Sequence, residues 1–205
     1  MEIYSTEEQQ VEAIKRFWRE HGNAIVVGTV LGLAGIYGWR WYSNAQLEAQ
    51  GQASEAYTQA VEALNAGDQA KAEAFIKGDS AGHYQALMAA TLAKSAVEAG
   101  ELDKALGHLD QAINQSEDEQ LKQIFTLRKV RILIAQDKGS DAESLLATVS
   151  GDAFKAEVAE LKGDIALARQ DYAAARQSYQ AALDASEGQA SSALELKLDQ
   201  LESKG

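Results

Sequence analysis

The feature that most constrains the fold is an uninterrupted run of 18 uncharged residues, Gly22 to Trp39, within a chain of 205 residues. As a helix rising 1.5 Å per residue, this run would be about 27 Å long, close to the thickness of a bilayer's hydrocarbon core. Aromatic residues flank it on both sides: Phe17 and Trp18 before it, and Trp39, Trp41 and Tyr42 at its end. Such aromatic belts are typical of membrane-spanning helices. The run therefore predicts one transmembrane anchor over residues 21–42.

Two other interpretations of this segment remain open. A cleaved signal peptide would place Ser43 and Ala45 at small-residue positions before the cut. Against it, the preceding region is long and rich in glutamate, and Trp and Tyr crowd the cleavage position. A buried helix of a soluble protein is the other alternative, and the flanking aromatic residues argue against it.

The basic residues near the anchor indicate its orientation. They are Lys15, Arg16 and Arg19 before the anchor and Arg40 directly after it. By the positive-inside rule, residues 1–20 form a cytoplasmic tail and residues 43–205 lie on the far side of the membrane. Apolar residues recur in the tail at helical spacing: Val11, Ile14, Phe17 and Trp18. We therefore expect a short amphipathic helix near the inner membrane surface.

Small residues share one face of the predicted anchor: Ala24, Gly28, Gly32 and Gly35, at spacings of four, four and three. Gly28 and Gly32 form a GxxxG pair, which lets the backbone of another transmembrane helix approach closely. Because glycine is common in membrane helices in any case, two interpretations stay open. Either Gly28, Gly32 and Gly35 form a packing face for another helix, or their presence reflects only the usual composition of membrane helices.

After residue 47 the pattern predicts helices throughout. The chain contains no Pro and is rich in Ala, Leu, Gln, Glu and Lys, which favour helix. No strand-like alternation of apolar and polar residues occurs. Turn signals separate helices of roughly 10–20 residues; they are Gly67-Asp68, Gly78-Asp79, Gly100-Glu101, Lys138-Gly139-Ser140, Gly151-Asp152 and Gln170-Asp171. The predicted fold class is therefore all-α.

A repeat is visible in the alanines that open every second helix: Ala72, Ala105, Ala142 and Ala175, which are 33, 37 and 33 residues apart. A period near 34 residues with a small residue at this position resembles a tetratricopeptide repeat, since paired helices approach closely only where side chains are small. Residues 86–119 and 156–189 match well, whereas 53–86 and 123–156 are degenerate. The predicted architecture is an α-solenoid capped by a last helix with Leu194, Leu198 and Leu201 on one face. A non-repetitive helical bundle is the alternative.

The net charge of −12 excludes some partners. Residues 43–205 hold 15 basic and 26 acidic groups, a balance of −11, so they would repel nucleic acid. This charge serves either solubility or a preference for basic partner segments. Cys is absent, and His21, His83 and His108 show no metal-ligand spacing. We therefore expect no metal, no cofactor, no catalytic residue and no enzymatic activity.

The N-terminal region also resembles the YfgM family of bacterial inner-membrane proteins. The resemblance rests on MEIY at residues 1–4, QVEAIKRFWREHG at 10–22 and GWRWY at 38–42, and it extends over the whole chain. It implies an ancillary subunit of the SecYEG translocon with a cytoplasmic tail, an inner-membrane anchor and periplasmic repeats. It further implies the chaperone PpiD as a partner and unfolded or secreted proteins as clients, which are passed to periplasmic chaperones.

Two other functions stay open on the sequence alone. The chain could be a membrane-anchored adaptor that assembles another envelope complex. Alternatively, its N-terminal tail could hold a cytoplasmic signalling protein.

Overall fold

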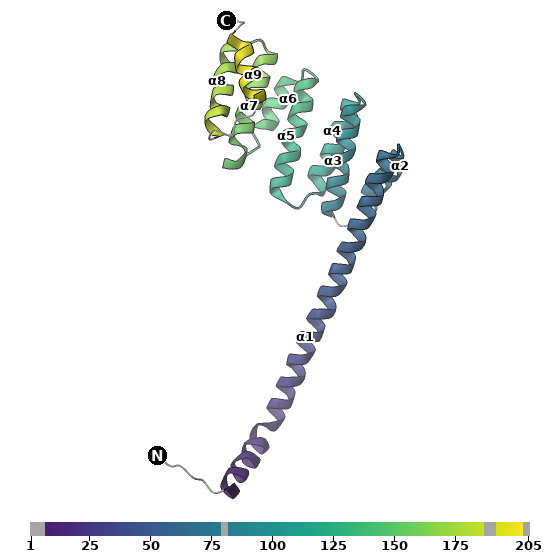
Figure 1. The fold of residues 1–205 in the computed structure, drawn as a ribbon, viewed down its shortest axis with the longest axis vertical. Helices are drawn as coiled ribbons and strands as arrows, with labels where there is room; N and C mark the ends of the chain where they lie inside the picture. Colours follow the sequence, from purple (N-terminus) through teal and green to yellow (C-terminus); the bar gives the residue numbers. More distant parts are fainter. Residues whose placement is uncertain (1–6, 79–81, 187–191, 203–205) are drawn as a thin grey trace. The chain divides into compact units, whose positions relative to one another are not determined.

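The computed structural model describes residues 7–78, 82–186 and 192–202, and these residues form helices and no strand. The predicted all-α fold class is therefore confirmed. The elements are α1 (Glu7–Asn65), α2 (Gln69–Lys77), α3 (Gly82–Glu98), α4 (Leu102–Gln115), α5 (Glu119–Ala135), α6 (Gly139–Leu146), the 3-10 turn η1 (Asp152–Phe154), α7 (Lys155–Ala168), α8 (Tyr172–Ala185) and α9 (Ser192–Glu202). Figure 1 shows the helices after α2 following one another as pairs in chain order. Residues 1–6 of the predicted tail and Asp79 of a predicted turn lie outside the described residues.

The chain divides into two compact units, Met1–Gln52 and Ala53–Gly205. In its described part, the first unit consists of the larger part of α1. The second, called the repeat unit below, contains the last turns of α1 and all the other helices. The limits of the cytoplasmic tail, the anchor and the following domain at residues 20 and 42 stay a prediction.

Four turns of the repeat unit have the same backbone conformation. The residue that ends the first helix of each pair has a positive φ: Gly67 (90°), Gly100 (77°), Asp137 (59°) and Gln170 (61°). In each turn the next residue donates its N–H to the carbonyl oxygen five positions earlier, at 2.8–2.9 Å. This is the hydrogen bond of a Schellman motif, which satisfies a carbonyl at the helix end. The turn therefore recurs at the same spacing as the alanines.

The third turn differs from its expected position. The sequence signal Lys138-Gly139-Ser140 predicts that Gly139 lies in the turn, but Gly139 is the first residue of α6 and Asp137 takes the left-handed conformation. A side chain other than glycine in this conformation costs roughly 1–2 kcal/mol, so sequence reasoning looks for glycine there. A Cβ at Gly139 would lie 3.7 Å from Nε of Arg169 and 4.0 Å from Ile165, so this glycine lies against the end of α7.

Each of the four alanines lies five residues after a left-handed turn residue, and each is 0% exposed: Ala72, Ala105, Ala142 and Ala175. They belong to three successive apolar clusters. The first extends from the end of α1 to α5, the second from α5 to α7, and the third from α7 to α9. The core is thus a row of interfaces between neighbouring helices, as in other repeat arrays. That these alanines set the approach of the paired helices stays a prediction.

Aspartates begin three of the helices. The carboxylates of Asp68, Asp118 and Asp171 accept hydrogen bonds from backbone N–H groups in the first turns of α2, α5 and α8. An N-cap of this kind stabilises a helix by about 1 kcal/mol. Asp118 is thus the N-cap of α5, directly before its first residue, Glu119.

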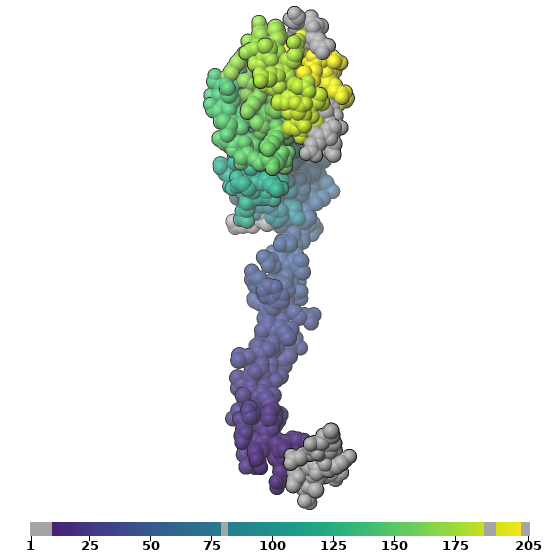
Figure 2. Space-filling model, turned by 90° about the vertical axis from the view of Figure 1, so that its left-hand side faces the viewer, coloured from purple at the N-terminus to yellow at the C-terminus, as the bar shows by residue number. Residues whose placement is uncertain are grey.

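The last helix, α9, packs against α8, and Figure 2 shows it in yellow among the C-terminal helices. Leu194 and Leu201 are buried in the third cluster and Leu198 is half-buried against it. Arg176 of α8 donates a hydrogen bond of 3.0 Å to the carbonyl oxygen of Leu201. The last helix thus buries the leucine face that the sequence pattern indicates.

Candidate interaction surfaces

The apolar part of α1 is the first candidate surface. Among the described residues, α1 is the one helix long and apolar enough to cross a membrane, with a mean hydropathy of 1.4 over its most apolar 18 residues. Only 6% of that window is buried, whereas the core helix of a soluble protein would be mostly buried. Trp39 and Trp41 are 70% and 75% exposed. Figure 2 shows side chains standing out along this stretch of α1 on the visible face.

The small-residue face of the predicted anchor is open. A Cβ added to Gly28, Gly32 or Gly35 would meet nothing within 4 Å in the described part of the chain. On this stretch the hydroxyl of Thr29 donates to the carbonyl oxygen of Ile25 at 2.8 Å. In a bilayer such a bond satisfies a polar group that lipid cannot. The three glycines therefore leave space for another helix, and their role as a packing face stays a prediction.

Two aromatic side chains of α1, Phe17 and Trp18, lie just before the predicted anchor in the sequence. The Phe17 ring stacks on His21 with centroids 4.9 Å apart. Trp18 lies over Gly22, where a Cβ would stand 3.4 Å from its indole. Phe17 and Trp18 nevertheless remain 55% and 59% exposed. Exposed rings at one end of an apolar helix are suited to the interface between headgroups and hydrocarbon.

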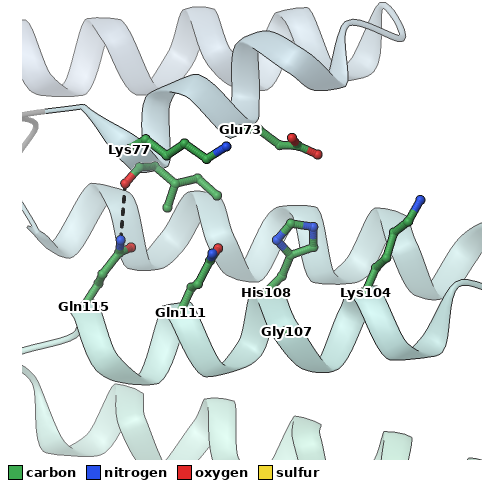
Figure 3. A pocket seen from close by; sticks show the side chains of 8 residues that line it. Glu73, Lys77, Lys104, Gly107, His108, Gln111 and Gln115 are labelled. Atoms are coloured by element: carbon green, nitrogen blue, oxygen red, sulfur yellow. Dashed lines mark hydrogen bonds between the residues drawn. The ribbon is translucent and has the colours of Figure 1, made fainter.

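A polar hollow of about 380 Å³ lies between α2 and α4 in the repeat unit. Figure 3 shows Lys77 and Glu73 of α2 facing His108 and Gln111 of α4 across it. Gln115 donates from Nε2 to the carbonyl oxygen of Ile76 at 3.3 Å, which joins the two helices. Its lining mixes both charges, so it presents no single chemical preference. Among the described residues no group of three or more His, Asp or Glu could hold a metal ion.

A second hollow, called the apolar groove below, encloses about 360 Å³ between α3 and α5, with α4 contributing Leu109. Its apolar lining is Ala90, Ala93, Val97, Leu109 and Ile132, and its charged lining is Lys94, Arg128 and Arg131. Sequence reasoning missed this site. No local sequence signal marks it, because its lining comes from three helices that only the fold brings together.

A third polar cluster joins α7, α8 and α9. The Tyr179 hydroxyl donates to Asp164 at 2.7 Å, and Lys197 Nζ donates to Glu160 and Asp164 at 2.7 Å each. Burial, then the hydrogen bond and charge of Asp164 and the charge of Glu160, raise the pKa of Tyr179 well above its ordinary range. Burial alone would lower the pKa of Lys197, but the two carboxylates outweigh it and raise that pKa. The cluster thus joins α9 to α7 through Lys197 and joins α8 to α7 through Tyr179.

Comparison with known proteins identifies the family to which the chain belongs. A family model described as a tetratricopeptide repeat-like domain matches residues 15–203. The chain is 37% identical over 165 residues to the ancillary SecYEG translocon subunit of Escherichia coli, a match that covers 80% of each chain. No solved structure matches the chain significantly.

Two further relatives carry the same name. The ancillary SecYEG translocon subunit of Haemophilus influenzae is 34% identical over 160 residues, covering 77% of this chain and 78% of that protein. The one from Aggregatibacter actinomycetemcomitans is 31% identical over 160 residues with the same coverage.

Proposed function

Because the chain belongs to the tetratricopeptide repeat-like family of ancillary SecYEG translocon subunits, we propose that it is a non-enzymatic accessory subunit of the SecYEG translocon. The observation that carries this proposal is the match to the Escherichia coli subunit over 80% of both chains. It is supported by the apolar stretch of α1 with exposed aromatic residues at both ends. Residues 21–42 anchor the protein in the inner membrane.

The proposal also includes an orientation and partners. The tail before the anchor is cytoplasmic and the repeat unit is periplasmic, because Lys15, Arg16 and Arg19 precede the anchor. The repeat unit acts as a scaffold near the secretion pore that helps pass secreted proteins to periplasmic chaperones, with PpiD as the neighbouring chaperone. The motif resemblance at residues 10–22 and 38–42 supports this part.

Copurification tests the proposal. The full-length protein carrying an affinity tag would be recovered from membranes in a mild detergent, and SecY, SecE, SecG and PpiD would be measured by mass spectrometry. An unrelated single-pass protein with the same tag is the control. We expect the translocon subunits to be enriched over the control. Enrichment of other envelope machinery without SecYEG would instead favour an adaptor function.

A further inference from the structure

The apolar groove has a charge opposite to that of the region around it. Its lining carries three cationic side chains, Lys94, Arg128 and Arg131, and no carboxylate. Residues 43–205 as a whole carry 26 acidic and 15 basic groups. A preference for basic partners is one interpretation of the net charge, but a ligand responds most strongly to charges within about 10 Å, because salt screens those farther away. The local charge of the groove therefore favours an anionic ligand.

Arg128 is available to such a ligand. Lys94 pairs with Glu98 at 3.7 Å, and Arg131 pairs with Glu157 at 2.6 Å. For Arg128 the described residues provide no ion pair, and its guanidinium carbon lies 5.9 Å from the centre of the Phe125 ring. A carboxylate can therefore approach Arg128 without displacing another one. Guanidinium groups bind carboxylates through two parallel hydrogen bonds, which are stronger than those between neutral groups.

The floor of the groove offers an apolar contact beside that arginine. Val97 is 42% exposed, and among the described residues of the repeat unit only Leu196 is another exposed large apolar side chain. The neighbouring Ala90 and Ala93 are small, which leaves a depression next to Val97. A volume of about 360 Å³ lies within the range of sites that bind ligands. The groove thus combines an apolar floor with an unpaired cation on its rim.

From these features we propose that the apolar groove binds an extended segment of a partner protein in which an apolar side chain is adjacent to an aspartate or glutamate. The apolar side chain lies on Val97 and the alanines, and the carboxylate pairs with Arg128. Along α3, Ala90 and Val97 are about 10 Å apart, which matches about three residues of extended peptide. This preference does not depend on whether the protein associates with SecYEG.

Labelled peptides test the preference on the full-length protein in detergent. The probe is a fluorescent six-residue peptide with two leucines alternating with two aspartates. Matched peptides carry asparagine or lysine in place of aspartate, which controls for partition of leucine into micelles. We expect the aspartate peptide to raise fluorescence anisotropy at a concentration at least fivefold lower than the other two. Equal binding of all three peptides, tighter binding of the lysine peptide, or no binding would overturn the proposal.

Variants then locate the binding. Arg128→Gln removes the unpaired cation and Val97→Asp removes the apolar contact; both positions are exposed, and a helical circular dichroism spectrum equal to wild type verifies the fold. Arg128→Gln should weaken binding of the aspartate peptide by about tenfold, the usual effect of losing one charge-assisted contact. Val97→Asp should weaken it at least as much, because the new carboxylate also repels the peptide. Lys162→Gln, an exposed change on α7 outside the groove, is the matched control. If Lys162→Gln weakens binding as much as Arg128→Gln does, the groove is not the site.

Discussion

Gly163 of α7 and the ring of Tyr179 of α8 are in direct contact, with no space for a side chain between them. A Cβ on Gly163 would stand 3.0 Å from Cζ of Tyr179 and closer still to Cδ1 and Cε1. Tyr179 cannot turn away, because it is 0% exposed and its hydroxyl is bonded to Asp164. Helices α7 and α8 therefore pack at a separation that only glycine permits at position 163.

This contact predicts that Gly163→Ala destabilises the repeat unit. The overlap should cost about 1–3 kcal/mol, as overpacking of a core usually does. The better helix propensity of alanine offsets up to about 1 kcal/mol of that cost. Gly107→Ala on α4 is the control, because its Cβ would meet nothing within 4 Å. Urea denaturation followed by circular dichroism should give a lower midpoint for the first variant and a slightly higher one for the second. Equal midpoints would contradict the contact.

The alanine repeat leads to a second prediction on the same helix. Ala175 is 0% exposed, so Ala175→Leu should destabilise the repeat unit by about 1–3 kcal/mol through overpacking. Ala173→Leu places the same side chain on the exposed side of α8 and should change stability by less than about 0.5 kcal/mol. The denaturation midpoints of the two variants are compared. An Ala175→Leu midpoint equal to that of wild type would remove the packing role from this position.

Alkaline pH should weaken the third polar cluster. Folding raises the pKa of Tyr179 and of Lys197 above their ordinary values of 10.0 and 10.5. A raised pKa means that the folded state holds the proton more tightly, so this stabilisation is complete below about pH 10 and is lost as pH rises further. Thermal unfolding should therefore show a midpoint that declines as pH is raised above about 10. The decline should be smaller in Tyr179→Phe than in Tyr84→Phe, a matched change in α3; the same decline in both would speak against this assignment.

The proposed topology is tested with reporters. A phosphatase that is active only outside the cytoplasm should be active when fused after Gly205, because the basic residues before the anchor hold the N-terminus inside. A fluorescent protein that matures only in the cytoplasm should be dark at the same position. The opposite pattern would reverse the orientation. An immunoblot against an N-terminal tag reports at the same time whether residues 1–42 stay attached.

The glycine face of the anchor is tested by copurification. Gly28→Leu combined with Gly32→Leu keeps the segment apolar, so insertion should survive, but it fills the face on which another helix would pack. Recovery of SecYEG should then fall. Val26→Leu with Val30→Leu adds volume on roughly the opposite side of the helix and is the matched control. Equal recovery with both double variants would show that the glycines reflect composition only.

The helical repeat was predictable because its cause is local. A small residue must recur wherever paired helices approach closely, and Ala72, Ala105, Ala142 and Ala175 carry that signal in the sequence. The third turn was less predictable than the other three, which lie where their sequence signals place them. Asp137 takes the left-handed conformation one residue before the signal Lys138-Gly139-Ser140, and neither Asp137 nor Gln170 is the glycine that this conformation favours. All four turns are closed by the same hydrogen bond from the next residue to the carbonyl oxygen five positions earlier.

The apolar groove was beyond sequence reasoning for a different reason. Val97 and Arg128 are brought together by the stacking of α3, α4 and α5, and each is unremarkable on its own helix. One interpretation of the net charge was even a basic partner, because a sum over the chain contains no information on where charges gather. The ion pairs of Lys197 were equally beyond sequence reasoning, because its carboxylate partners lie 33 and 37 residues earlier in the chain.

The bonds of Lys197 also affect how the repeat unit opens. In a simple linear array, each element contacts its neighbours, so the terminal helix can fray alone. Here α9 bonds past α8 to Glu160 and Asp164 of α7, while Arg176 of α8 bonds to Leu201. Detachment of α9 would leave two half-buried carboxylates without their cation beside the Tyr179 ring. We therefore expect the last three helices to open together, so that their most protected backbone amides share one free energy of opening in hydrogen exchange.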